Sequence, residues 1–179
     1  MSQIANTYAQ ALYDLAKDEN QTEAILRQML TLQEAFRQEP DFLRLMTAAN
    51  LSKEERCRIL DDSFRGRVEP YLLNFMKILT EKGYMRHFGS CAKAYRDAYN
   101  LDHGILPVQA VTAAPMTREQ VDRLTQKLEK LTGKTIDLSC RVDPALLGGV
   151  RLDYDGKRVD GTVQGRLESV SKLLKNTVL

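Results

Sequence analysis

A glycine-rich segment near the end of the chain, residues 143–167, constrains the fold more than any other feature. Its sequence, DPALLGGVRLDYDGKRVDGTVQGRL, places a Gly-Gly pair, two Asp-Gly dipeptides and a Gly-Arg-Leu between apolar residues. Glycine at this density indicates positions where the backbone takes a positive φ or approaches another group closely. Such positions occur in tight turns, in bulges and at phosphate-binding sites. The segment alone therefore leaves a structural and a ligand-binding interpretation open.

Composition narrows the class of protein. The chain has 179 residues, of which 43% are hydrophobic and 28% charged, so it is long enough to bury a core as one domain or two small ones. A net charge of +2 does not favour a general binder of nucleic acid or membranes. No apolar run approaches the ~20 residues of a membrane-spanning helix, and the first residues resemble neither a secretory signal nor a transit peptide. We therefore expect any membrane association to be indirect.

The first hundred residues carry helical patterns only. Apolar residues recur at helical spacing, as in the first helix with Ile4, Tyr8, Ala11, Leu12 and Leu15. Ser52 followed by Glu55 predicts a capping box, and Pro40 and Pro70 stand where helices begin. These signals predict six short helices that form a bundle and end near residue 104.

After Ile105 the pattern changes. Residues 105–112 are predicted as a strand, Thr117 as the cap of a helix that ends at Gly133, and residues 136–142 as an alternating strand. Asp155-Gly156 predicts a two-residue β-hairpin turn. Thr162 then caps a final predicted helix, which carries Val163, Leu167, Val170 and Leu174. The predicted fold class is α+β, with an N-terminal helical bundle at 1–104 and a small α/β domain with a mixed sheet at 105–179.

The sequence contains no convincing catalytic or metal site. Residues 156–162, GKRVDGT, have the glycine spacing of a P-loop, but they lack its lysine and lie on a predicted hairpin. Three aspartates nearby lack the glutamate that completes a calcium loop, and no nucleophile motif accompanies His87. Three widely spaced cysteines and two histidines do not form a zinc motif. We expect reduced thiols, no cofactor, no bound metal and no catalysis.

Two parts of the chain are candidates for binding a partner. Lys157, Arg158 and Arg166 have only Tyr154 as an aromatic neighbour, so a solvated hairpin is favoured over a nucleic-acid site. The first helix and the helix at 69–81 are apolar on more than one face. Such a helix is either central in its bundle or offers its second face to another chain, and periodicity leaves both alternatives open.

Three stretches together resemble one family. The run LLGGVRLDYDGKRVDGTVQGRL looks like the signature of the delta subunit of F-type ATP synthase, whose mitochondrial member is the oligomycin-sensitivity-conferring protein. ANTYAQALYDLA resembles the first helix of that family, and LTEKGYM resembles the end of its fifth helix. The sequence departs from the family in having Thr162 where serine is more usual and a polar Tyr154-Asp155 at the hairpin tip. The resemblance extends over essentially the whole chain.

The resemblance implies a non-catalytic connector that joins the catalytic head to the peripheral stalk and holds the head static against rotor torque. It implies that an N-terminal helix of the alpha subunit binds between the first and fifth helices, and that the C-terminal domain docks the C-terminal ends of the b subunits. The implied groove residues are Tyr8, Ala11, Leu12, Asn74, Phe75 and Ile78. The implied signature and turn residues are Gly148, Gly149, Gly156, Asp160, Gly161, Gly165, Arg166 and Leu167.

With no transit peptide, the resemblance implies a bacterial subunit at the cytoplasmic face of the plasma membrane. Without the resemblance, the residues leave two other hypotheses about the function open. The chain could be an unrelated helical adaptor with an accessory α/β domain, or a phosphate-binding enzyme that uses the glycine-rich segment.

Overall fold

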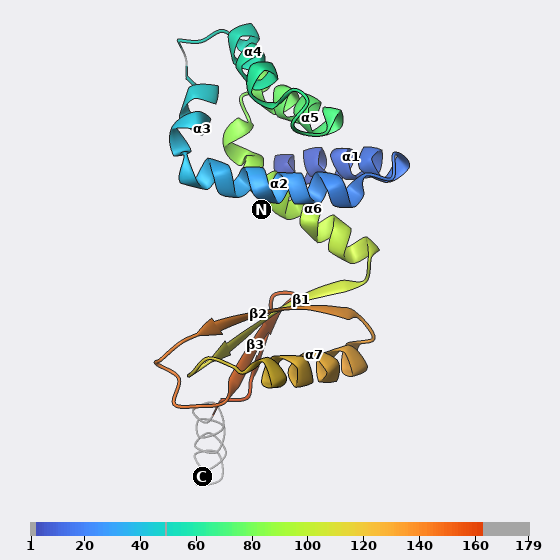
Figure 1. Cartoon of the computed structure of the whole chain (residues 1–179), viewed down its shortest axis with the longest axis vertical. Helices are drawn as coiled ribbons and strands as arrows, with labels where there is room; N and C mark the ends of the chain where they lie inside the picture. Colours follow the sequence, from blue (N-terminus) through green and yellow to red (C-terminus); the bar gives the residue numbers. More distant parts are fainter. Residues whose placement is uncertain (1–2, 49, 163–179) are drawn as a thin grey trace, which may run out of the picture. The chain divides into compact units, whose positions relative to one another are not determined.

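The computed structural model describes residues 3–48 and 50–162, and the chain divides into two compact units between Tyr99 and Asn100 (Figure 1). Within the described residues the fold is α+β, with seven α-helices, one short 3₁₀ helix and a four-stranded sheet. The helices are α1 Gln3–Asp18, α2 Thr22–Gln38, α3 Pro40–Met46, α4 Lys53–Phe64, α5 Pro70–Glu81, η1 Met85–His87, α6 Phe88–Asp102 and α7 Arg118–Thr132. The strands are β1 Ile105–Thr112, β2 Thr135–Val142, β3 Val150–Tyr154 and β4 Lys157–Asp160.

Local sequence signals account for many helix ends. At the start of α4 the Ser52 hydroxyl accepts a hydrogen bond from the Glu55 amide at 3.1 Å, and the Glu55 carboxylate accepts one from the Ser52 amide at 2.8 Å. Thr117 and Gln120 make the same reciprocal pair at the start of α7. Each pair satisfies two amides that a helix start leaves without partners, and both predicted capping signatures are confirmed.

The core of the first unit is built on an aromatic cluster. The Phe36 ring stacks on Phe42 at a centroid distance of 5.1 Å and meets Phe88 edge-on at the same distance. On the other side, Tyr13 meets Tyr95 edge-on at 5.2 Å, and the Tyr95 hydroxyl donates to the carbonyl of Thr22 at 3.1 Å. These contacts join residues from α1, α2, α3 and α6, so the apolar stripes of helices distant in sequence converge on one core.

An ion pair joins α4 to α5 at the edge of this core. Lys77 Nζ lies 2.6 Å from Asp61 Oδ1, and Arg65 Nη2 lies 3.1 Å from the same oxygen. The hydrogen bond from Lys77 lowers the pKa of Asp61 below its ordinary value, with Arg65 adding to the effect. Lys77 thereby marks the side of α5 that faces α4.

Replacing this carboxylate is expected to make folding stability less dependent on pH. Because the Asp61 pKa is lower in the folded protein, its stabilising contribution is present above the ordinary carboxyl pKa of about 3.9 and is lost as the pH falls through the folded value. We expect Asp61→Asn to be less stable than the wild type at pH 7 in urea unfolding, and the gap to close as the pH falls toward 2. Asp62→Asn, at an exposed neighbour, is the control. A gap that persisted unchanged at pH 2 would contradict this origin.

The second unit contains the mixed sheet, as predicted. Its strand order is β2-β1-β3-β4, with β1 parallel to β2 and antiparallel to β3, and β3 antiparallel to β4. α7 connects the two parallel strands. The β3–β4 hairpin turns at Asp155 (φ 47°) and Gly156 (φ 70°), which is the double positive φ of a tight two-residue turn. The predicted hairpin is confirmed, whereas the final helix predicted after Thr162 lies outside the described residues.

Candidate interaction surface

Helices α1 and α5 pack against each other, and side-chain contacts near their opposite ends show that they run antiparallel. Near the start of α1 the Tyr8 ring meets the Tyr84 ring edge-on at 6.0 Å, and Tyr84 lies just beyond the end of α5. At the opposite end Glu19, which follows α1, accepts a hydrogen bond from Tyr71 in the first turn of α5, and its negative charge raises the pKa of the Tyr71 phenol. Tyr8 and Tyr71 therefore identify the sides of the two helices that face each other.

The interior face of α1 consists largely of small side chains. Its buried residues are Ala5, Ala9, Leu12, Tyr13 and Ala16. Of the apolar stripe predicted from spacing, Ile4 is 37% exposed and Leu15 is 41% exposed, Ala11 is exposed and Tyr8 is half-buried. The small side chains of Ala5, Ala9 and Ala16 allow close helix packing, so the alanine face enters the core and the larger apolar residues remain outside.

Helix α5 also carries an apolar residue outside the core. Leu72, Phe75, Met76 and Leu79 are buried, whereas Ile78 is 44% exposed. Ile78 lies seven residues, or about two turns, after Tyr71 and so on the side that faces α1. Asn74, which is exposed, lies one turn before Ile78.

We call these neighbouring residues the α1–α5 surface. It comprises Ile4, Tyr8, Ala11, Leu15, Asn74 and Ile78. Four of the six residues expected to line a groove belong to it, while Leu12 and Phe75 are 4% and 5% exposed and lie at its boundary with the core. Ile4 and Leu15 were missed as surface residues. Their helical spacing from Tyr8 and Ala11 contained the signal, but periodicity left open whether this stripe faces the core or another chain.

The glycine-rich segment forms turns that hold β3 and β4 in place. Gly149 precedes β3 with φ 89°, and a Cβ there would lie 2.6 Å from the carbonyl oxygen of Gly161. The Gly161 amide donates to the Val150 carbonyl at 3.0 Å. The Asp160 carboxylate accepts hydrogen bonds from the amide and hydroxyl of Thr162 at 2.9 and 2.6 Å. Gly148 has a positive φ of 147°.

These contacts bear on the phosphate-binding hypothesis. Lys157–Asp160 form β4, so the residues between Gly156 and Gly161 are a strand of a hairpin and not the loop that cradles phosphates in a P-loop. Gly165, Arg166 and Leu167, the remaining signature residues, lie outside the described residues.

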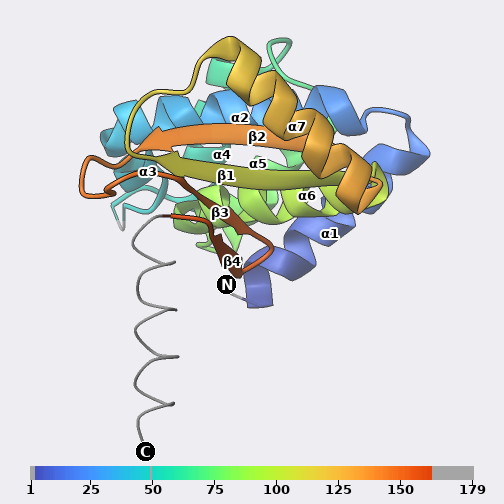
Figure 2. The same ribbon diagram turned by 90° about the horizontal axis from the view of Figure 1, so that it is seen from below.

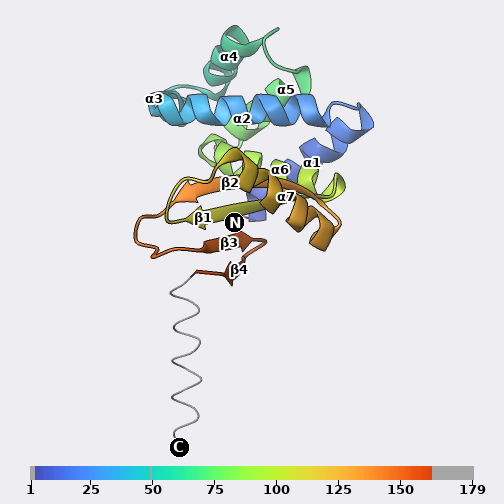
Figure 3. The ribbon, with the colours of Figure 1, turned by 60° about the horizontal axis from the view of Figure 1, so that its bottom comes forward.

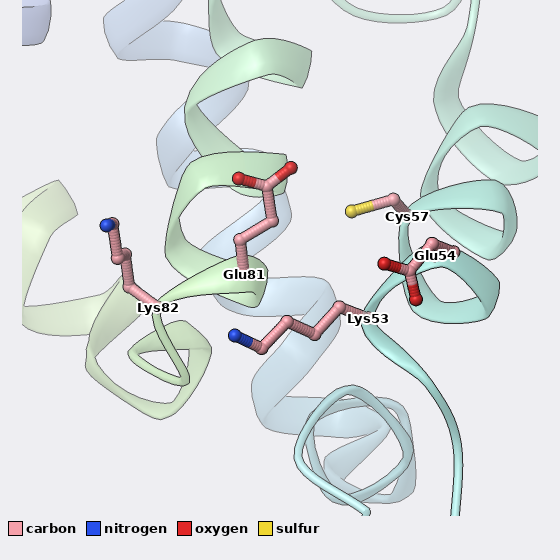
Figure 4. A pocket seen from close by; sticks show the side chains of 5 residues that line it. All are labelled: Lys53, Glu54, Cys57, Glu81 and Lys82. Atoms are coloured by element: carbon pink, nitrogen blue, oxygen red, sulfur yellow. The ribbon is translucent and has the colours of Figure 1, made fainter.

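A pocket of about 350 Å³ lies between α4 and the end of α5 (Figure 4). Its lining residues are Lys53, Glu54, Cys57, Glu81 and Lys82. Burial raises the pKa of the Cys57 thiol, and the charge of Glu81 adds to this, so the thiol stays protonated and a poor nucleophile near neutral pH. Across residues 3–48 and 50–162, no three His, Cys, Asp or Glu side chains are grouped so as to hold a metal ion. This pocket lacks the features of an active site.

The three thiols are expected to react at different rates. Cys140 is exposed, Cys57 is half-buried, and Cys91 is buried with its pKa raised to about 11. Alkylation with iodoacetamide at pH 8, followed by mass spectrometry of peptides, should modify Cys140 first, Cys57 more slowly and Cys91 only in denaturant. Denatured protein, in which all three should react alike, is the control. Fast modification of Cys57 in the folded protein would contradict the environment described for its pocket.

Comparison with known proteins identifies the family. Residues 4–174 match the model of the ATP synthase delta (OSCP) subunit. This chain belongs to that family. It is 30% identical to ATP synthase subunit delta of Alkaliphilus oremlandii over 175 residues, covering 96% of this chain and 97% of that protein. It is 27% identical to the subunit of the same name from Clostridioides difficile, covering 98% and 97%.

A solved structure has the same fold. A chain of the Toxoplasma gondii mitochondrial ATP synthase hexamer superposes with a TM-score of 0.76 at 19% identity, covering 97% of this chain and 98% of the other. As a delta-family member, the chain is a structural subunit of F-type ATP synthase and is not catalytic. Of the helices within the described residues, none has both the length and the apolar character that crossing a membrane requires.

Proposed function

We propose that this delta-family subunit is a connector in the peripheral stalk, joining the catalytic head to the b subunits and holding the head static against rotor torque. In this proposal the N-terminal helix of the alpha subunit binds between α1 and α5, over a groove lined by Tyr8, Ala11, Leu12, Asn74, Phe75 and Ile78. The C-terminal ends of the b subunits dock on the second unit. The complex lies at the cytoplasmic face of a bacterial plasma membrane.

The observation that carries this proposal is the α1–α5 surface. Ile4, Leu15 and Ile78 are each more than a third exposed, although they are large apolar side chains on two adjacent helices. A partner helix with an apolar stripe would remove them from water, and each fully buried side chain contributes ~1.5–3 kcal/mol. A static link needs such an interface because it must hold under torque without chemistry of its own.

We also propose where the boundary between the two domains lies. We take residues 1–104 to be a six-helix bundle and residues 105–179 to be the second domain. Support comes from α6 ending at Asp102, from the positive φ of Gly104 (64°) and from β1 beginning at Ile105. Residues 1–104 expressed alone should unfold cooperatively on heating, and a broad, non-cooperative transition would count against this boundary.

Calorimetric titration with an alpha-subunit peptide tests the proposed function. The peptide comprises the first ~25 residues of the cognate alpha subunit, which is long enough for several helical turns. We expect one-to-one binding with a negative heat-capacity change, which is the mark of apolar burial. A scrambled peptide of the same composition is the control. No binding at micromolar concentrations would reject the α1–α5 surface as the alpha site.

A further inference from the structure

Strand β2 is an outer strand of the second unit's sheet, and its edge is long. The strand order is β2-β1-β3-β4, so within the described residues β2 pairs with β1 alone. Figures 2 and 3 both show β2 on the outer side of β1. The other outer strand, β4, has four residues of which three are charged, whereas β2 has eight of which two are charged. Because short, charged edges resist pairing with another chain, β2 is the edge that is more open to strand addition.

The hydrogen bonds to β1 determine which backbone groups of β2 point outward. At one end of the ladder the Thr135 amide donates to the Gly104 carbonyl at 3.1 Å, and just beyond the other end the Asp143 amide donates to the Thr112 carbonyl at 2.8 Å. Bonding residues alternate along a parallel pair, so the odd-numbered residues of β2 bond to β1. The even-numbered residues direct their N–H and C=O groups away from β1. This outward set is Ile136, Leu138, Cys140 and Val142.

The sequence of β2 complements itself about Ser139. Two copies of the strand, placed antiparallel around a two-fold axis through Ser139, bring Asp137 of each copy opposite Arg141 of the other. In this register the outward residues lie opposite each other and can exchange about eight backbone hydrogen bonds. The two ion pairs then occupy non-hydrogen-bonded positions, where opposite side chains are closest. The outward residues pair as Leu138 with Cys140 and Ile136 with Val142.

Charge favours this register over its neighbours. Moving the axis one residue forward, to Cys140, brings Asp137 opposite Asp143, and moving it one residue back leaves Asp137 opposite Ser139. Neither alternative forms the two ion pairs. Within the chain Arg141 Nη2 lies 3.7 Å from Asp143 Oδ2, and the Arg141 side chain is 59% exposed. The guanidinium is therefore accessible to an acid on another chain.

Helix α7 leaves part of β2 uncovered. It packs against this strand, and along the first half Ile136 is 8% exposed and Leu138 half-buried. Along the second half Cys140 is exposed and Val142 is 42% exposed. The two-fold axis places the covered half of each strand beside the uncovered half of the other. Each α7 would then lie next to the apolar residues that the other copy leaves exposed.

We propose that the free chain forms a two-fold dimer by pairing the edges of two β2 strands, which joins the two sheets into one. The partner is a second copy of this chain, selected by the self-complementary charges of Asp137 and Arg141. The inference does not depend on the proposed function, because it concerns the chain outside any complex. The dimer closes an edge that would otherwise be open to aggregation.

Sedimentation velocity of the full-length chain, at concentrations up to about 0.5 mM because small interfaces bind weakly, tests the inference. Asp137→Arg and Arg141→Asp should each weaken dimerisation at least about tenfold, since each makes two attractive cross-strand pairs repulsive. An equal mixture of these two variants should associate like the wild type, because one then carries two positive charges at the contact and the other two negative charges. Asp97→Arg, the same charge change at an exposed position of α6, should have no effect.

A cysteine on the two-fold axis tests the register independently. In a Cys140→Ser background, Ser139→Cys should form an intermolecular disulfide under mild oxidation. Opposite residues at a non-hydrogen-bonded position have Cα atoms ~4.5 Å apart, which a disulfide can span. Asp137→Cys in the same background is the control, because its counterpart lies about 13 Å further along the partner strand. Mixing Asp137→Cys with Arg141→Cys should restore cross-linking.

Each outcome supports or overturns the inference. A wild type that stays monomeric throughout this concentration range would overturn it. A dimer that both charge variants leave unchanged would overturn it too, since the contact would then lie elsewhere. Cross-linking through Cys140 of the wild type without cross-linking of Ser139→Cys would reject the register. Recovery of association in the mixture of charge variants would support the inference, because variants that had only lost their fold would not regain binding.

Discussion

Replacing Ile78 by aspartate is expected to weaken binding of the alpha-subunit N-terminal peptide about 100-fold. The side chain is 44% exposed on the α1–α5 surface, so the free protein loses little packing when it is changed. In the proposed complex the substitution would remove an apolar contact and place a carboxylate where water is excluded. Together these cost about 3 kcal/mol, and each 1.4 kcal/mol corresponds to a factor of ten in Kd. Calorimetric titration measures the change directly.

Two further variants make this experiment specific. Leu45→Asp changes an apolar residue of α3 that is 40% exposed and lies outside the α1–α5 surface, so it should bind like the wild type. Ile78→Lys should bind as poorly as Ile78→Asp. Near the end of α5 a lysine interacts favourably with the helix dipole and an aspartate unfavourably, so the two variants differ in their effect on the helix but share the loss of the apolar contact. Loss of binding in the aspartate variant alone would point to a damaged helix instead of a lost contact. Equal loss with Leu45→Asp would reject the surface.

The sequence predicted the features of the fold that depend on local chemistry. The Ser52 and Thr117 caps and the Asp155-Gly156 turn each require particular residue types at fixed offsets, and each lies where it was expected. The alternation in β2 was also visible, because Ile136 and Leu138 share one face of the sheet.

Which stripe of a helix enters the core could not be predicted in the same way. In α1 two apolar stripes lie side by side. Because isoleucine and leucine are more hydrophobic than alanine, hydrophobicity alone favours burial of Ile4 and Leu15 over burial of Ala5 and Ala9. The structure buries the alanines, since close approach of neighbouring helices depends on side-chain size and on which helix lies opposite. Which part of the sheet is buried could not be predicted for a related reason. Cys140 and Val142 look like interior residues by alternation but are exposed, because only the register and the position of α7 decide which part of the face is covered.

Replacing Gly149 by alanine is expected to destabilise the second unit by about 3 kcal/mol. The residue has φ 89°, where a side chain is strained, and its Cβ would lie 2.6 Å from the Gly161 carbonyl oxygen and 2.7 Å from the Thr162 Cα. Both neighbours are backbone atoms in the segment that pairs with Val150, so they cannot move aside as a flexible side chain would. Backbone strain and overpacking each cost ~1–3 kcal/mol. Urea-dependent hydrogen exchange of peptides from β1 and β3 reports the stability of this unit separately.

Gly156→Ala is the matched control, since it isolates strain from contact. Gly156 has φ 70°, but a Cβ there would meet nothing within 4 Å, so only strain of about 1 kcal/mol is expected. A larger loss at Gly149 than at Gly156 would mean that the glycine-rich segment is retained for a close backbone approach between β3 and the residues after β4. Equal losses of stability in the two variants would mean that the glycines of this segment serve only to allow the turn conformation. If Gly149→Ala cost nothing, the glycines would need a different explanation, and the phosphate-binding interpretation of this segment would have to be tested again with inorganic phosphate and ATP.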